Sequence, residues 1–257
     1  MGMRLSLSAV VAAAVALTVS VVAVAAGTAA DAPILARDLI LKNNSANLQY
    51  GWRVPPEVGI EPALFHMMHA KAEAGLVAGL GQANADAAAA KKAGDPVHQY
   101  TDLRYWDVAA DTTRLLALIG QVYGYTGGAH GNSGFDTVIW DRKSQAVIGL
   151  PSLFSDRVKA RAILEPLVCA ALAKEQAARR GGVKAAPEFE KCPPLEQASV
   201  VPFGGMAPVA HSVRVIYAPY VAGPYVEGSY EITLPWPAAI KPLVKPEFRE
   251  ALFGVVE

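Results

Sequence analysis

The sequence has few charged residues and only two cysteines, and each shortage excludes some classes of function. Only 18% of its 257 residues are Asp, Glu, Lys or Arg, and 23 basic side chains balance 23 acidic ones. Because there is no basic excess, we expect binding neither to nucleic acid nor to an acidic membrane surface. The sequence also lacks repeats, heptad arrays and long low-complexity linkers, which leaves a globular chain long enough for a hydrophobic core.

The two cysteines are Cys169 and Cys192, and 22 residues lie between them. An even number of cysteines in an oxidising compartment suggests one disulfide, which for a loop of this size is worth about 3 kcal/mol. Two unrelated buried thiols are the alternative. A zinc site is disfavoured because neither cysteine has a Cys or His neighbour at the spacing of metal ligands, so we expect no metal.

The N-terminus has the layout of an export signal. Arg4 is followed by an uncharged apolar run over residues 5–26, and the first acidic residue is Asp31. This predicts a signal peptide over residues 1–30, with small residues before two candidate cleavage sites. The apolar run is nearly long enough to span a bilayer, so a retained N-terminal anchor is the alternative. Either way, we expect a periplasmic or otherwise extracytoplasmic protein, tethered to the inner membrane if the segment is retained.

The remaining chain, about 225 residues, shows strand and helix patterns in mixed order. Alternating apolar residues and turn signals predict strands, and runs of alanine, leucine and charged residues predict helices. Gly75, Gly79 and Gly81 are expected to loosen the first helix. The proline-rich residues 187–202 are expected to be irregular. The predicted strands are two within residues 33–54, then 99–109, 114–125, 135–141, 146–150, 212–218 and 230–236; the helices are 62–92, 156–180 and a short one at the C-terminus.

A glycine-rich segment with tyrosines covers residues 123–134, between two predicted strands. Five glycines in twelve positions suggest positive φ angles or the close approach of another group. The segment is neither a Walker loop nor a dinucleotide fingerprint, so we expect no cofactor. Tyrosines beside one histidine suit a ligand surface, although a plain hairpin with a structural histidine is the alternative. The candidate ligand-binding residues are Tyr123, Tyr125, Thr126, Gly127, Gly128, His130 and Gly131.

A second segment, residues 217–230, repeats the pair Pro-Tyr before the last predicted strand. Proline stiffens the chain and can hold the tyrosine rings outward or across a neighbouring loop. Exposed rings would indicate a protein-binding surface, whereas buried rings would be ordinary packing. The candidate binding residues are Pro219, Tyr220, Pro224 and Tyr225.

These segments carry a resemblance to a bacterial family. The run Tyr-Gly-Tyr-Thr-Gly-Gly-Ala-His-Gly, the following Phe-Asp-Thr, the turn Leu-Pro-Ser-Leu-Phe and the late Glu-Ile-Thr-Leu-Pro occur in the family's order across about residues 95–245. The sequence therefore resembles the extracytoplasmic domain of RsiV-type anti-sigma factors and PdaC-type peptidoglycan deacetylases.

The resemblance implies an α+β fold of two small sheet-plus-helix subdomains, which we place at residues 31–154 and 155–257. It also implies a non-catalytic binding role, because the RsiV-type member binds lysozyme. Lysozyme-like hydrolases and peptidoglycan fragments are therefore the partners we expect. Ala218 and Val221 stand where the family usually has acidic residues, which puts any specificity carried by those acids in doubt.

An envelope enzyme is the alternative function. His66, His69 and Glu73 have helical spacing that could place them on one face as metal ligands. A hydrolase could instead use His130 with Ser133 and Asp136, but no Gly-x-Ser-x-Gly elbow surrounds the serine. The deacetylase relatives carry their chemistry in a separate domain, for which we expect no room here. Only four residues precede the apolar run, so we also expect no cytoplasmic segment that could hold a sigma factor.

Overall fold

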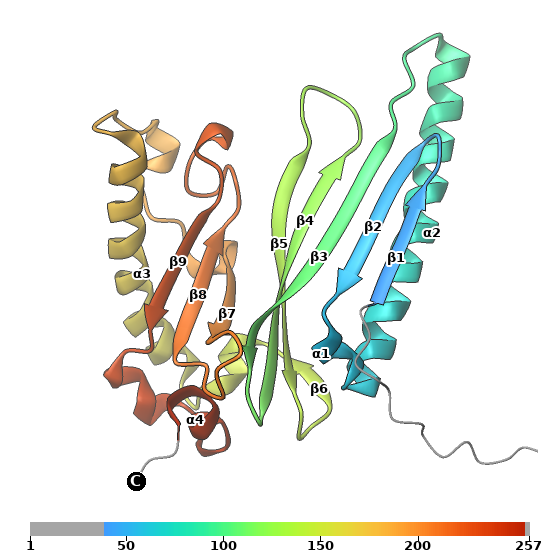
Figure 1. Ribbon diagram of the computed structural model, residues 1–257. Helices are drawn as coiled ribbons and strands as arrows, with labels where there is room; N and C mark the ends of the chain where they lie inside the picture. The colour runs from blue at the N-terminus through green and yellow to red at the C-terminus, as the bar shows by residue number, and fades with distance from the viewer. Residues whose placement is uncertain (1–38, 255–257) are drawn as a thin grey trace, which may run out of the picture. The chain divides into compact units, whose positions relative to one another are not determined.

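The computed structural model describes residues 39–254, so the predicted signal peptide or anchor at residues 1–30 lies outside the described part. The described chain has an α+β fold with two sheets and packed helices (Figure 1). A six-stranded sheet has its strands in chain order, and only the pair β2 and β3 is parallel. Its strands are β1 (Leu39–Asn44), β2 (Leu48–Val54), β3 (Tyr100–Asp111), β4 (Leu115–Tyr125), β5 (Asn132–Asp141) and β6 (Ala146–Ile148).

The second sheet has three antiparallel strands in the order β7-β8-β9. They are β7 (Ser199–Phe203), β8 (Ser212–Tyr217) and β9 (Tyr230–Pro235). The helices are α1 (Pro56–Gly59), α2 (Pro62–Ala93), α3 (Arg157–Arg180) and α4 (Pro246–Phe253). Five 3-10 helices connect these elements: η1 (Leu150–Leu153), η2 (Pro187–Phe189), η3 (Leu195–Gln197), η4 (Tyr225–Glu227) and η5 (Ala238–Leu243).

Helix α2 supplies the crossover that a parallel pair of strands requires. It runs without a break to Gly94, which caps it at φ 77°, so the expected loosening at its glycines was wrong. Two of those glycines instead allow close packing on β2. A Cβ at Gly75 would lie 2.9 Å from the hydroxyl oxygen of Tyr50, and that hydroxyl donates to the carbonyl of Ala72 at 2.8 Å. Burial raises the pKa of Tyr50 to about 12.

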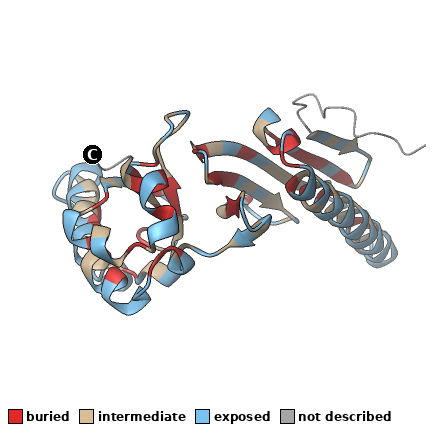
Figure 2. Cartoon of the chain, turned by 90° about the horizontal axis from the view of Figure 1, so that it is seen from below, coloured by how far each residue is buried: buried red, intermediate tan, exposed pale blue. Residues whose placement is uncertain are grey.

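Strand β4 is buried on both faces over residues 115–120, whereas residues 121–125 are exposed or partly buried. Leu116 and Leu118 belong to the core between the sheet and α2. Leu115, Ala117 and Ile119 belong to a second core, which joins the opposite face of that sheet to the three-stranded sheet, α3 and α4. Figure 2 shows the buried residues on the strands and on the inner sides of the helices. The boundary at residue 154 between the two subdomains stays a prediction.

Strand β7 corrects the expectation that residues 187–202 are irregular. It pairs with β8 despite Pro202, which β7 tolerates because it lies at an edge of its sheet. Val201 is fully buried. The amides of Gly204 and Gly205 both donate to the carbonyl of Ala109 at 2.9 Å, which fixes the end of β7 to β3.

The predicted disulfide is present. Cys169, in the middle of α3, is bonded to Cys192 in the segment that leads to β7, and their Cα atoms lie 5.5 Å apart. Disulfides of this kind are typical of proteins that function outside the cytoplasm. Within residues 39–254, no helix is both long and apolar enough to cross a membrane.

Candidate functional site

The glycine-rich segment and the Pro-Tyr segment meet in space. The ring of His130 stacks on the ring of Tyr225 with centroids 4.2 Å apart and planes 22° apart. The ring of Tyr220 lies 5.5 Å from that of Tyr225 and 6.5 Å from that of His130. We call these three residues the His–Tyr cluster. It joins the loop between β4 and β5 to the loop between β8 and β9.

Hydrogen bonds order the cluster. Nδ1 of His130 lies 2.8 Å from the carbonyl oxygen of Gly131. Since a carbonyl oxygen only accepts, Nδ1 carries the proton, and in the neutral ring Nε2 accepts from the Tyr220 hydroxyl at 3.3 Å. The Tyr225 hydroxyl donates to the same Gly131 carbonyl at 3.2 Å. The Tyr220–His130 and Tyr225–Gly131 bonds therefore hold the two loops together, whereas the bond of Nδ1 lies within the glycine-rich loop.

Close contacts between tyrosine side chains and glycines determine the conformation of the glycine-rich loop. A Cβ at Gly131 would overlap the Tyr123 hydroxyl and lie 2.8 Å from the carbonyl oxygen of Gly124. The Tyr125 hydroxyl donates to the carbonyl of Gly128 at 3.1 Å. Gly127 and Gly128 have φ angles of 102° and 95°, which favour glycine. Thr126 is exposed between these residues.

The Pro-Tyr loop presents one strained and exposed aromatic residue. Tyr220 has φ 71° and is 53% exposed, and a left-handed conformation costs a bulky residue on the order of 1–3 kcal/mol. Its amide donates to the carbonyl of Gly223 at 3.0 Å, which closes the turn. Pro224 precedes η4, which carries Tyr225, while Pro219 is half-buried. The backbone therefore holds the Tyr220 ring at the surface beside His130.

The end of α3 fixes the base of the Pro-Tyr loop. The Arg180 guanidinium makes two bonds to the Glu227 carboxylate, at 2.9 and 3.0 Å, and the Tyr230 hydroxyl donates to the same carboxylate. Arg179 donates to the carbonyls of Glu227 and Ser229 at 2.8 and 2.7 Å, and its guanidinium lies over the Tyr230 ring. The loop is thus bonded at its base to a helix.

The charges at this base shift two pKa values. The hydrogen bond from Arg180 is the main reason that the pKa of Glu227 lies below its ordinary value, and the bond from Tyr230 lowers it further. Burial, followed by the hydrogen bond to Glu227, raises the pKa of Tyr230 to about 12. The carboxylate is therefore ionised at neutral pH and the phenol is neutral.

Leu103 and Tyr105, which the sequence did not single out, lie beside the predicted tyrosines. Register pairs Leu103 with Tyr123, and alternation puts both on the face of the sheet opposite α2, together with Tyr105 and Tyr125. We call these four residues the tyrosine face. Tyr105 and Tyr123 are 36% and 37% exposed. The strands predicted over residues 99–109 and 114–125 contained part of the signal, because the same alternation runs along both strands, but their pairing comes from the structure.

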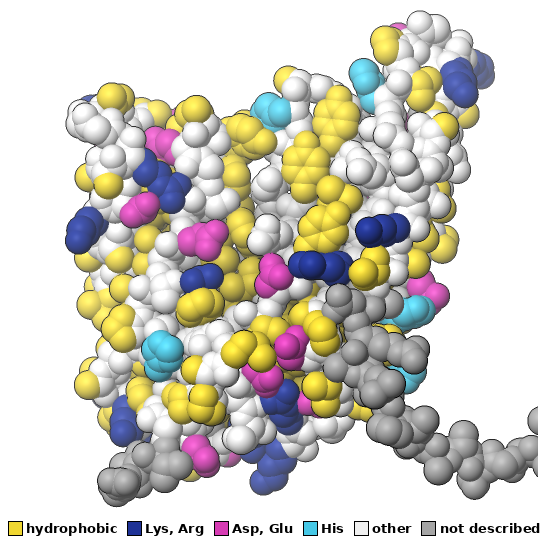
Figure 3. Space-filling view, viewed as in Figure 1, with side chains coloured by type: hydrophobic (Ala, Val, Ile, Leu, Met, Phe, Trp, Pro, Cys, Tyr) yellow, Lys and Arg dark blue, Asp and Glu magenta, His cyan; other side chains and the backbone are white. Residues whose placement is uncertain are grey.

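The tyrosine face and the His–Tyr cluster are contiguous. The Tyr123 hydroxyl lies against Gly131, whose carbonyl accepts from Tyr225. Figure 3 shows hydrophobic side chains gathered over β3 and β4 on the face that it presents. Arg53 borders this surface, with its guanidinium 5.9 Å from the centre of the Tyr105 ring. Together the two groups of residues form one aromatic surface, the name we use below.

The structure does not assemble the two enzymatic sites considered from the sequence. His69 pairs with Glu73 at 3.3 Å, and His66 is exposed. Across residues 39–254, no three His, Cys, Asp or Glu side chains lie close enough together to hold a metal ion. Asp136 is paired with Arg104 at 3.2 Å. Within the described chain the ring nitrogens of His130 bond Gly131 and Tyr220 but not Ser133.

Comparison with known proteins identifies the fold. No model of a known protein family matches the sequence, and no curated protein sequence does. The structure is similar to that of a DUF3298 family protein from Pseudomonas aeruginosa PAO1, with a TM-score of 0.50, 19% identity, and coverage of 84% of this chain and 97% of that one. A member of the same family from Bacteroides fragilis gives a TM-score of 0.49 at 14% identity, over 82% and 94% of the two chains. The similarity to the Pseudomonas aeruginosa structure shows that the described chain has a fold seen in a DUF3298 family protein.

Proposed function

We propose that the protein is a non-catalytic binding protein of the cell envelope and that the aromatic surface is its binding site. The observation that carries this proposal is the stacking of His130 on Tyr225, which unites two loops far apart in the sequence. The predicted export signal and the disulfide between Cys169 and Cys192 support a place outside the cytoplasm.

Aromatic side chains on a rigid frame suit recognition. Tyrosine offers a large contact area with few rotatable bonds, so little conformational entropy is lost when a partner binds. Here Arg179 and Arg180 hold the base of the Pro-Tyr loop, and Gly131 lets the Tyr123 hydroxyl pack against the backbone of the glycine-rich loop. Ordering the loops before binding reduces the free energy that binding would otherwise spend on ordering them.

The partner is proposed from the resemblance to RsiV-type and PdaC-type domains. We propose a lysozyme-like hydrolase, with a peptidoglycan fragment as the second ligand to try. Because Ala218 and Val221 replace the family's acidic residues, contact with the aromatic rings, and not charge, should dominate the affinity. Binding should therefore weaken little when the ionic strength is raised.

Calorimetric titration with lysozyme and with muropeptides tests the proposal. Tyr220→Ala and Tyr225→Ala should each weaken binding about tenfold or more, as expected for central aromatic contacts. Ile60→Ala is the matched control, because Ile60 is 59% exposed and lies outside the aromatic surface. The proposal would be refuted if the folded protein bound neither ligand. It would also be refuted if the tyrosine variants and the control bound the ligand with equal affinity.

A further inference from the structure

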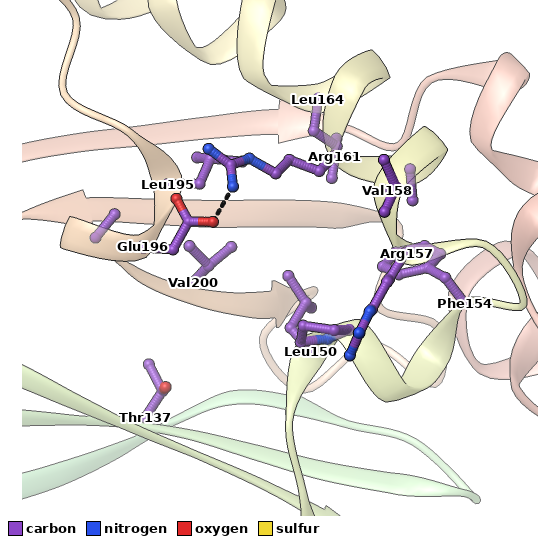
Figure 4. A pocket seen from close by; sticks show the side chains of 13 residues that line it. Thr137, Leu150, Phe154, Arg157, Val158, Arg161, Leu164, Leu195, Glu196 and Val200 are labelled. Carbon is purple, nitrogen blue, oxygen red and sulfur yellow. Dashed lines mark hydrogen bonds and ion pairs between the residues drawn. The ribbon is translucent and has the colours of Figure 1, made fainter.

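A second candidate site is a cavity of about 460 Å³ beside α3. It lies between the first half of α3, η1, η3, β5 and β7, and Figure 4 shows the side chains around it. Its volume is within the range of about 300–1,000 Å³ that is usual for small-molecule sites. Most of its wall is apolar: Leu150, Phe154, Val158, Leu164, Leu195 and Val200.

The apolar wall is accessible to solvent. Val158 is 73% exposed at the rim, and Leu150, Leu195 and Val200 are only partly buried. Apolar surface left in contact with water is unfavourable, so a ligand with an alkyl chain would gain free energy by covering it. The cavity shares no residue with the aromatic surface, so the two sites would act on different ligands.

Two arginines line the cavity, and they differ in their pairing. Arg161 pairs with Glu165 at 3.1 Å and with Glu196 across the upper wall. Arg157 reaches from α3 toward Leu150 in Figure 4. Across residues 39–254 no carboxylate pairs with Arg157. The cavity therefore combines an apolar wall with one cation that has no anionic partner in the described chain.

We propose that this cavity binds a free single-chain alkyl carboxylate, with the alkyl chain among Leu150, Leu164 and Val200 and the carboxylate against Arg157. An alkyl ammonium of the same length is disfavoured because its head would meet Arg157. A ligand with several negative charges is disfavoured by Glu196, which lies on the opposite wall. The site is independent of the proposed protein-binding function.

The test compares two probes of equal chain length and opposite charge. Dodecanoate and dodecyltrimethylammonium are titrated into the full-length protein below their micelle concentrations and at low ionic strength. Dodecanoate should bind roughly two- to fivefold more tightly, as expected for one charge pair near the surface. Arg157→Ala should remove this preference, and Lys159→Ala should keep it, because Lys159 is an exposed cation on the same helix that does not line the cavity.

A second set of variants tests the place of binding. Ala198→Phe should fill the cavity and abolish binding of dodecanoate while leaving binding of lysozyme unchanged. If that variant does not fold, Thr137→Leu narrows the cavity from β5 and should weaken binding. Equal affinity for both probes, no binding by the folded wild type, or full binding by a folded Ala198→Phe or Thr137→Leu protein would overturn the proposal. Loss of lysozyme binding in Tyr225→Ala with dodecanoate binding intact would separate the two sites.

Discussion

The ion pair between Arg180 and Glu227 should be a main support of the Pro-Tyr loop. The two side chains are 11% and 16% exposed and make two hydrogen bonds. Glu227→Gln keeps the size of the side chain and removes its charge, which leaves the Arg180 cation largely buried without a counterion. The perturbation therefore acts on the contacts of the carboxylate with Arg180 and with the Tyr230 hydroxyl, and it changes little of the packing.

The loss of stability expected for Glu227→Gln follows from the burial of this ion pair. Removing one partner of a fully buried pair costs about 3–5 kcal/mol. Glutamine retains an acceptor oxygen and Arg180 keeps some contact with water, so the free energy of unfolding should fall by about 2 kcal/mol. For a domain of this size such a loss lowers Tm by roughly 4–8 °C.

The effect should depend on pH in a defined direction. Because Arg180 holds the pKa of Glu227 below its ordinary value of 4.5, the carboxylate stabilises the folded state fully above that value. The stabilisation is lost as the pH falls through the lowered pKa of the folded state. The difference in the free energy of unfolding between wild type and Glu227→Gln should thus be largest at pH 7 and should become smaller in acid.

Thermal denaturation at several pH values measures this difference, with Asp107→Asn as the control. Asp107 also pairs with an arginine of another element, Arg53 at 3.4 Å, but the two side chains are 55% and 48% exposed. An exposed pair contributes only about 0–1 kcal/mol. If Glu227→Gln lost no more stability than Asp107→Asn, or if its loss grew in acid, the reasoning about the loop base would be refuted.

Three further predictions concern the loops, the disulfide and the buried phenols. Gly131→Ala should lower the free energy of unfolding by about 1–3 kcal/mol in a denaturant titration, because its Cβ meets a backbone oxygen; Gly134→Ala has open space and should be nearly neutral. Replacing Cys169 and Cys192 together by serine should cost about 3 kcal/mol, and a reductant should have the same effect on wild type alone. An absorbance titration should show three tyrosines that ionise only near pH 12 in the folded protein. The free energy of unfolding that they contribute should be complete below about pH 10 and should fall as the pH rises toward 12. These tyrosines are Tyr50, Tyr217 and Tyr230.

Much of the fold could be predicted because its signals are local. The alternation of apolar residues over 114–125 predicted strand β4, and Pro62 and Gly94 bound α2 at its two ends. Strand β7 could not be predicted in the same way. Its five residues include Pro202, and it is stabilised by non-local contacts, namely the bonds of the following glycines to Ala109.

The candidate site was predictable in its residues but not in its assembly. Glycine content and repeated Pro-Tyr pairs single out two loops, yet nothing local says that His130 stacks on Tyr225. The hydrogen bonds at the base of the Pro-Tyr loop also depend on Arg180, which the sequence shows only as a basic residue at the end of a predicted helix. The cavity beside α3 had no sequence signal, because five separate elements contribute to its wall.

Hydrogen exchange with and without bound lysozyme tests the central claim most directly, with a muropeptide mixture as the second ligand. If the aromatic surface is the binding site, one ligand should slow exchange in residues 123–134 and in residues 217–230 together, and Tyr225→Ala should remove both effects. Protection of neither segment, or protection confined to other parts of the chain, would contradict the account.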